Sequence, residues 1–307
     1  MKVKTKKKIM SKKEVNFKNK VFWLIKRGVF IWVIFCTWLT SNFPPNYKDE
    51  AFDGYYHIYR RIKGFSQQKL LAHANFEMDY RKIIPASTQV VIFGEMHGNP
   101  LLGTANLSAK TELIKHMEEF KQMGFGYLGL EMFPADKQEI LDRYFETPEY
   151  EVEANYHLEE EILQILKDFW GWAPEKYLEL IQVVKKHGIR PIALHNGGER
   201  TSDFFLSEKI SDFLMRNPEG RIMVFVGYSH LFNLGQYLER FAPFKIAFLG
   251  GANYRIFGKY DWTVIEQITK QAGFEDKRFL LKAEDVVSSL GYHPVMGADI
   301  YIHLPND

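Results

Sequence analysis

Residues Gln89-Val-Val-Ile-Phe-Gly-Glu-Met-His97 join a short apolar run to a glycine, a carboxylate and an imidazole. An unbroken apolar run of this length, ended by a glycine, is typical of a strand that is buried on both faces of a parallel sheet. The pattern recurs along the chain. Further apolar runs of this kind are Tyr127–Leu130, Pro191–Leu194, Ile222–Val226 and Lys245–Leu249.

Segments with helical periodicity lie between these runs. Pro174–His187 starts with a proline, ends on Lys185-Lys186-His187 and is followed by Gly188, so both of its ends carry helix signals. The other predicted helices are Ser108–Met123, Ser207–Met215 and Leu234–Phe241. The alternation predicts an α/β fold, a mostly parallel sheet with helices on both faces. Since residues 42–307 contain no repeat or linker, we expect them to form one main domain.

Composition and charge exclude several classes of protein. A chain of 307 residues with 46% hydrophobic residues can bury a large core, and its single cysteine, Cys36, excludes an intramolecular disulfide and a multi-cysteine metal site. The whole chain carries a formal net charge of +2, and residues 1–27 carry +10, so residues 28–307 carry −8. An acidic body is a poor binder of phosphate backbones, so we expect no nucleic-acid partner.

The basic N-terminus is followed by an apolar stretch. Residues 28–39 are uncharged and apolar and come directly after Lys26-Arg27, as in the core of a secretory signal. Twelve residues fall short of the roughly 20 that span a bilayer. We therefore interpret residues 1–41 as a signal peptide or membrane anchor that places the body outside the cytoplasm, in the cell envelope. The sequence is compatible with either cleavage or retention of this N-terminal segment. The bulky Phe35 before Cys36 argues against attachment of a lipid to Cys36.

Polar side chains follow four of the predicted strands. They are Glu95 and His97 after the first, Glu131 after the second, His195 and Asn196 after the third, and Tyr228 and His230 after the fourth. Ligands of parallel sheets bind beyond the carboxyl ends of the strands, so we expect these residues to line one crevice. Gly94 and Gly227 each precede a histidine by three residues, and a glycine that takes a positive φ would turn each histidine back over the sheet edge.

Two kinds of chemistry suit this set of residues. His97, His230 and Glu131 match the ligands of an open divalent metal site, for Mn, Co or Zn, with Glu95 available as a base. Without a metal, the same histidines and glutamates suit general acid and base chemistry near neutral pH.

The order of these motifs resembles that of a known family. Gly94–Pro100, Leu128–Phe133, Leu141–Tyr144, Gly188–Leu194 and Val226–His230 look like the motifs of ChaN-like proteins. These belong to the haem-binding uptake and Tiki superfamily, with Tiki-type metallopeptidases and erythromycin-esterase-like and TraB-like proteins as relatives. The resemblance covers about residues 85 to 250. It implies an exported, often lipid-anchored protein that binds haem as a homodimer and serves iron acquisition.

The resemblance also suggests roles for individual residues. In Tiki-type relatives two Gly-x-x-His motifs and a glutamate carry metal-dependent peptidase activity, and they match His97, His230 and Glu131. In esterase-like relatives the first motif does acid–base work, which matches Glu95 and His97. Either His195 or Asn196 takes a further family position, and no tyrosine is assigned as the haem ligand.

Two functions are therefore expected from the sequence. The first is haem or iron binding in iron acquisition, with haem as the ligand. The second is metal-dependent hydrolysis of the peptidase or esterase type, acting on a small-molecule or peptide substrate.

Overall fold

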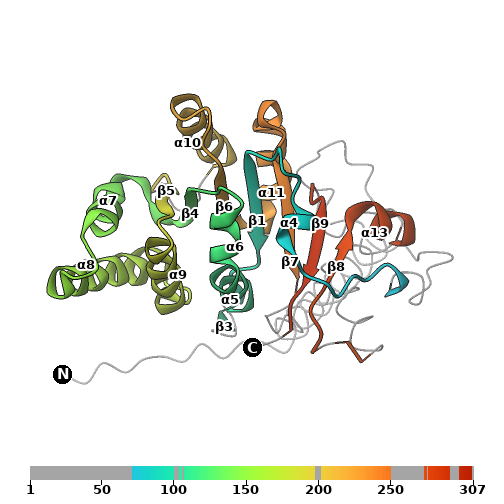
Figure 1. Ribbon diagram of the computed structural model, residues 1–307, viewed down its shortest axis with the longest axis horizontal. Coiled ribbons are helices and arrows are strands. Elements are labelled where there is room, and N and C mark those ends of the chain that lie inside the picture. Colours follow the sequence, from blue (N-terminus) through green and yellow to red (C-terminus); the bar gives the residue numbers. More distant parts are fainter. Residues whose placement is uncertain are drawn as a thin grey trace, which may run out of the picture. The chain divides into compact units, whose positions relative to one another are not determined.

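A seven-stranded sheet lies at the centre of the protein, in the order β5-β4-β6-β1-β7-β9-β8 (Figure 1). The computed structural model describes residues 71–99, 104–105, 107–197, 202–249, 273–274, 276–290 and 297–305. Contacts within the chain define two units, Met1–Arg61 and Ile62–Asp307, and the sheet with its helices belongs to the second. The predicted signal or anchor lies outside the described residues. Among the described helices, none has the length and apolar character that a membrane crossing needs.

The five predicted strands are confirmed and form neighbouring members of this sheet. They are β1 (Val90–Glu95), β4 (Tyr127–Pro134), β5 (Arg190–His195), β6 (Ile222–Gly227) and β7 (Phe244–Leu249). They pair in parallel, as does β9 (Ile300–His303) with β7, whereas β8 (Phe279–Lys282) pairs antiparallel with β9. A short separate hairpin joins β2 (Gly98–Asn99) and β3 (Thr104–Ala105). The predicted α/β class with a mostly parallel sheet is therefore confirmed.

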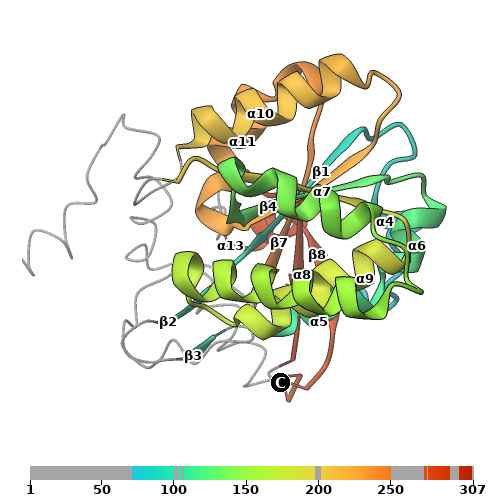
Figure 2. The same ribbon diagram turned by 90° about the vertical axis from the view of Figure 1, so that its left-hand side faces the viewer.

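Helices cover both faces of the sheet, as Figure 2 shows. Val91 and Phe93 of β1 belong to one core, and Val90 and Ile92 belong to the other, because successive strand residues point to opposite faces. The first core is covered by α4 (Tyr80–Ile83), α5 (Ser108–Lys115), α6 (Met117–Gln122), α7 (Gln138–Glu146), α8 (Val152–Ile165) and α9 (Pro174–Lys186). The second is covered by α10 (Asp203–Arg216), α11 (Leu231–Tyr237) and α13 (Ala283–Leu290).

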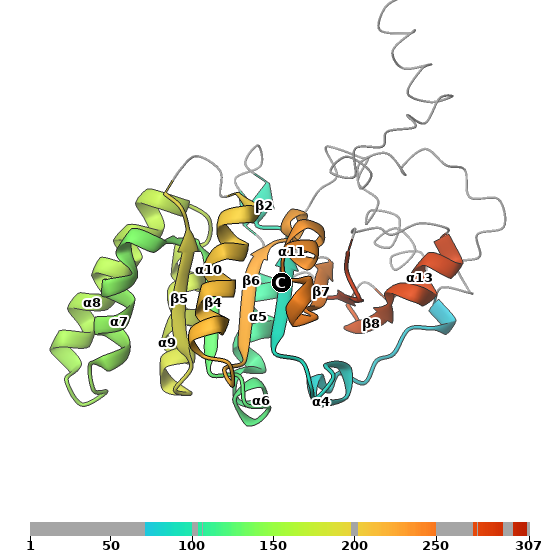
Figure 3. The same cartoon turned by 90° about the horizontal axis from the view of Figure 1, so that it is seen from above.

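The β5 edge of the sheet is covered by a side chain. β5 is the outermost strand on the side of α7 (Figure 3). Gln138, the first residue of α7, accepts a hydrogen bond of 2.6 Å from Ala193 N–H and donates one of 3.1 Å to the Pro191 carbonyl. Pro191 has no N–H of its own. The Gln138 amide therefore occupies two of the strand groups that an eighth strand would use.

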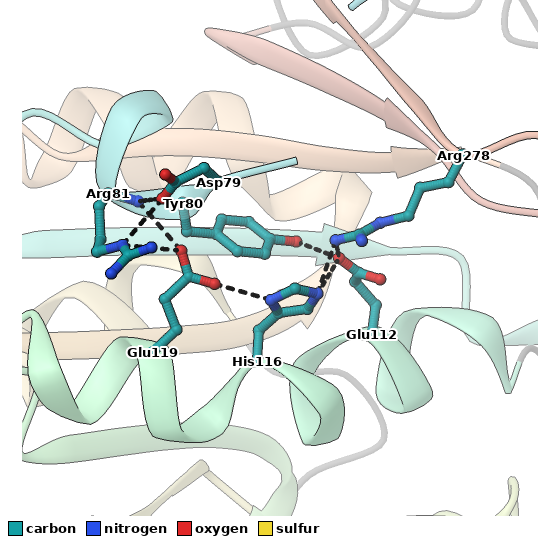
Figure 4. A network of polar contacts seen from close by, with 7 residues as sticks. All are labelled: Asp79, Tyr80, Arg81, Glu112, His116, Glu119 and Arg278. Atoms are coloured by element: carbon teal, nitrogen blue, oxygen red, sulfur yellow. Dashed lines mark hydrogen bonds and ion pairs between the residues drawn. The ribbon is translucent and has the colours of Figure 1, made fainter. Parts of the chain in front are cut away.

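The helix predicted over Ser108–Met123 is divided at His116 into α5 and α6. A polar network surrounds the break (Figure 4). His116 contacts Glu119 at 2.8 Å and the guanidinium of Arg278 at 2.9 Å, and Arg278 also pairs with the buried Glu112. Glu112 accepts a further hydrogen bond of 2.8 Å from the Tyr80 hydroxyl. The network links α4, α5 and the segment before β8.

We expect the Glu112→Ala variant to be less stable than the parent protein by about 1–3 kcal/mol, because it leaves the Tyr80 hydroxyl and the Arg278 guanidinium without their buried acceptor. Urea unfolding of the full chain measures this. Glu118→Ala, at an exposed position of α6, is the matched control. Equal unfolding midpoints for the two variants would contradict the prediction.

Candidate active site

The structure brings three of the predicted site residues together at the carboxyl ends of β1, β4 and β6. Glu131 of β4 lies between the two histidines: its Oε1 is 3.1 Å from His230 Nε2 and its Oε2 is 3.7 Å from His97 Nε2. His97 follows β1, and His230 ends the 3₁₀ turn η4 (Tyr228–His230) after β6. Because β6 pairs with both β1 and β4, the three strand ends are neighbours in space.

Glu95 is fully buried behind His97. Both of its oxygens accept hydrogen bonds of 2.7 Å from Lys110 Nζ, Oε1 also accepts one from the Tyr177 hydroxyl, and Oε1 lies 3.0 Å from His97 Nδ1. Burial would raise the pKa of Glu95, but the Lys110 charge and His97 outweigh burial, so this pKa lies below its usual value. Burial also lowers the pKa of Lys110 against the attraction of Glu95. Glu95, which was predicted as a base, is thus fully buried and lies against His97 Nδ1.

His230 is held between two carboxylates. Its Nδ1 contacts Asp203, and its Nε2 faces Glu131. Burial opposes a charge here, but hydrogen bonds to Asp203 and Glu131 outweigh it and raise the pKa of His230 to about 10. Glu131 is buried as well, yet His230, His97 and a 2.6 Å hydrogen bond from Gly227 N–H lower its pKa to about 2. The pair is therefore an imidazolium and a carboxylate at neutral pH.

Three residues of this site were missed from the sequence: Lys110, Tyr177 and Asp203. Lys110 and Tyr177 lie inside α5 and α9, where a lysine and a tyrosine are ordinary helix residues. Asp203 follows Ser202, whose hydroxyl accepts a hydrogen bond from Phe205 N–H at the start of α10. A serine followed by an acidic residue is a helix-start signal, and it could have placed Asp203 at a helix N-terminus but not beside His230.

The two glycines of the Gly-x-x-His motifs act by size and not by a positive φ. Gly227 has φ −61°, and Gly94 is absent from the described glycines with positive φ. A Cβ at Gly227 would lie 2.7 Å from His97 Nε2, and a Cβ at Gly94 would lie 2.7 Å from a Leu231 methyl carbon and 2.9 Å from Tyr228 Cα. The expected conformational role is therefore wrong. The glycines let the histidine and the following turn approach the sheet.

A Gly227→Ala substitution is expected to displace the His97 ring and to cost about 1–3 kcal/mol of stability through overpacking. Urea unfolding and the histidine ring signals in NMR spectra measure the two effects. Gly126→Ala is the matched control, since a Cβ there meets nothing within 4 Å. An unmoved His97 signal in Gly227→Ala would contradict the prediction.

The remaining predicted site residues, His195, Asn196 and Tyr228, differ in how deeply they are buried. His195, which ends β5, is buried, and its Nδ1 accepts a 3.0 Å hydrogen bond from Gly197 N–H. Burial lowers the pKa of His195, although its ring senses the charges of Glu131 and His230. Asn196 is exposed, and Tyr228 is half-buried against the core under α10 and α11.

Two aromatic side chains border the histidines. The π-helix η3 (Leu166–Trp170) places Trp170 edge-on against His97, with ring centroids 4.7 Å apart, and Phe169 edge-on against His195 at 4.6 Å. Gly171 and Ala173, which follow, both have positive φ, 74° and 45°. For an alanine this conformation is strained, and π-helices and strained backbone cluster at functional sites.

The site does not fit the predicted divalent metal. Within the part of the chain that the structure describes, no group of three or more His, Cys, Asp or Glu side chains is arranged to hold a metal ion. Both ring nitrogens of His230 face carboxylates, so both carry protons and neither has a lone pair to give to Mn, Co or Zn. His230 and Glu131 are arranged as a hydrogen-bonded pair with His97 beside them, and not as a ligand set.

The charge on His230 makes the stability of the protein depend on pH. Its pKa rises from 6.5 to about 10 on folding, so its contribution is complete below pH 6.5 and is lost as the pH rises through 10. We expect the free energy of unfolding to fall over this range with a slope of at most about 1.4 kcal/mol per pH unit. Urea unfolding at several pH values checks this, and His230→Gln should flatten the slope. Equal slopes in both proteins would contradict the prediction.

Residues 85–203 match the family model described as haem-binding uptake, Tiki superfamily, ChaN, and the resemblance predicted from the motifs is confirmed over these residues. No curated protein matches the chain.

Three solved structures are similar to it. An erythromycin esterase EreC mutant in its open conformation has a TM-score of 0.42 and 12% identity, with 79% of this chain and 97% of that chain covered. The type III effector HopBA1 has a TM-score of 0.40 and 15% identity, with 54% and 80% covered. ChaN of Campylobacter jejuni, solved with cofacial haem binding, has a TM-score of 0.32 and 13% identity, with 54% and 83% covered.

Proposed function

We propose that this protein, whose residues 85–203 match the ChaN and Tiki family model, is a hydrolase that uses His97, Glu131 and His230 for general acid–base catalysis. The observation that carries the proposal is the sharing of one buried carboxylate by two histidines from different strand ends. Each histidine has its other ring nitrogen on a separate carboxylate, Glu95 or Asp203. Carboxylate–histidine pairs of this kind orient an imidazole for proton transfer.

The reaction class follows from what two imidazoles a short distance apart can do. One accepts a proton from a water molecule as the water oxygen bonds to an acyl carbon, and the other donates a proton to the oxygen or nitrogen that leaves. The atoms balance, because one water is consumed and its two hydrogens end on the two products. Carboxylic esters and amides are the substrate class that this chemistry suits.

The test is hydrolysis by the purified full-length chain of a panel of nitrophenyl esters and fluorogenic peptides. We expect turnover of at least one ester or peptide, and loss of that turnover in Glu131→Gln. Glu139→Gln, at an exposed position of α7, is the matched control. Turnover equal to that of buffer, or equal in Glu131→Gln and Glu139→Gln, would overturn the proposal.

Haem binding in iron acquisition is the second candidate, and the family match supports it. His230 does not fit a haem ligand, because both of its ring nitrogens face carboxylates, and the His97 ring is packed edge-on against Trp170. We therefore place haem away from this site and assign no ligand. Titration of the full chain with hemin should give a Soret band of defined stoichiometry, with a dimer detected by light scattering. Hemin titration curves that match those of an unrelated protein would contradict haem binding.

We also propose that residues 1–41 hold the protein at the inner membrane, or direct its export, with the body in the cell envelope. The supporting observation is the run of basic residues before the apolar segment 28–39. A reporter fused to the C-terminus, active only outside the cytoplasm, tests this. Replacement of Lys26 and Arg27 by glutamate should reduce its activity, and an inactive parent fusion would contradict the proposal.

A further inference from the structure

Asp203 stands at the beginning of α10 with both carboxylate oxygens engaged. Oδ1 contacts His230 Nδ1, and Oδ2 accepts a 2.6 Å hydrogen bond from the Asn233 amide of α11. Asp203 is the first helical residue after the capping Ser202, where the partial positive charge of a helix N-terminus stabilises a carboxylate. The carboxylate is therefore held in place by groups from two neighbouring helices.

The two histidines have different charge surroundings. On the His97 side, the charge of Glu95 is balanced by the buried Lys110, at 2.7 Å from both carboxylate oxygens. On the His230 side, Asp203 accepts a hydrogen bond from the Asn233 side-chain amide, and Glu131 accepts one from Gly227 N–H. Neither of those donors carries a charge. His230 therefore faces two carboxylates, Asp203 and Glu131, that among the described residues have no cationic partner besides the histidines. His97 faces Glu95, whose charge is balanced by Lys110, and one oxygen of Glu131.

Hydrogen-bond geometry separates the two rings in the same way. A ring nitrogen that faces a carboxylate at hydrogen-bond distance must carry a proton, and both nitrogens of His230 do so. His97 Nε2 lies 3.7 Å from Glu131, beyond hydrogen-bond distance. The nearby His195 ring adds no positive charge, because burial lowers its pKa. His230 is therefore the ring that holds two protons, and His97 is the ring with a nitrogen left to accept one.

We propose that Asp203 is a positioning residue of this site: it holds the His230 ring through Nδ1 and favours the doubly protonated ring, so that His230 gives the proton that Nε2 otherwise shares with Glu131 to the leaving group, and His97 accepts the proton of the water. The assignment rests on the proposed hydrolytic function. After each turnover, His97 gives the proton that it took from water to the solvent and His230 takes one proton from the solvent, so the net reaction consumes only substrate and one water.

The Asp203→Asn variant tests the proposal, since it keeps the shape of the side chain and removes its charge. We expect a fall in kcat of at least about tenfold, part of the 10²–10⁴-fold that a positioned acid contributes, with little change in KM. The alkaline limb of the pH–rate profile should move to lower pH, because His230 then loses its proton more easily. Asp212→Asn, at an exposed position of the same helix, is the matched control. Profiles that coincide in the two variants would overturn the proposal.

A second measurement does not depend on turnover. Long-range ¹H–¹⁵N NMR spectra of the full chain distinguish a ring with two protonated nitrogens from a neutral one, and His230→Gln identifies the signals of His230. We expect a doubly protonated ring at pH 7.5 in the parent protein and a neutral ring in Asp203→Asn. A neutral ring in the parent, or an unchanged ring in the variant, would overturn the role of Asp203. If no substrate is hydrolysed but the ring behaves as expected, the hydrolytic function fails and the positioning by Asp203 stands.

Discussion

Replacement of His97 by alanine is expected to lower the rate of hydrolysis by ~10²–10⁴-fold, the contribution of a positioned general base. His97 is partly exposed, with 22% of its side chain accessible, and its Nδ1 lies against Glu95, so its Nε2 is the group placed to accept a proton from water. The fall should appear in kcat, because proton transfer belongs to the transition state and not to substrate binding.

Initial rates for a substrate found in the ester and peptide panel measure this effect. His157→Ala is the matched control, since His157 is an exposed histidine of α8, far from the site in the chain. Far-ultraviolet circular dichroism confirms that each variant is folded. An His97→Ala protein that keeps the parent rate would show that His97 is not the base.

The Lys110→Met variant is expected to be less stable than the parent protein by about 3–5 kcal/mol. Lys110 and Glu95 are both fully buried, and the lysine is the charge that balances the carboxylate. Methionine fills a similar volume but leaves Glu95 as an uncompensated buried charge. The loss should appear in urea unfolding at pH 7.

A double variant isolates the cause of this loss. Glu95→Gln combined with Lys110→Met removes both charges, so we expect it to recover a large part of the lost stability. Lys115→Met, at an exposed position of α5, is the control for the substitution itself. If Lys110→Met and Lys115→Met unfold at the same urea concentration, the ion pair between Lys110 and Glu95 does not stabilise the fold.

The sequence predicts the inner part of the sheet well because buried parallel strands are unbroken apolar runs. Once β1, β4 and β6 are placed side by side, the meeting of His97, Glu131 and His230 follows from the parallel direction of the strands. The four-residue strands β8 and β9 were not predicted, since a run that short is not distinctive.

The residues behind the histidines could not be predicted for a different reason. Lys110, Tyr177 and Asp203 lie on helices, and which face of a helix meets a strand end depends on how the helix packs on the sheet. The burial of Glu95 could not be predicted for the same reason, because it comes from α5 and α9 packing over this side chain. Sequence alone identifies the strand ends, and packing decides what surrounds them.

The Gln138 side chain on the outer border of β5 also bears on how the protein behaves at high concentration. An edge strand with unpaired N–H and C=O groups can pair with the edge strand of another molecule, and repeated pairing of this kind leads to aggregation. Here one carboxamide already occupies that border, at Ala193 and Pro191. These two hydrogen bonds therefore disfavour pairing of a second copy along this part of β5.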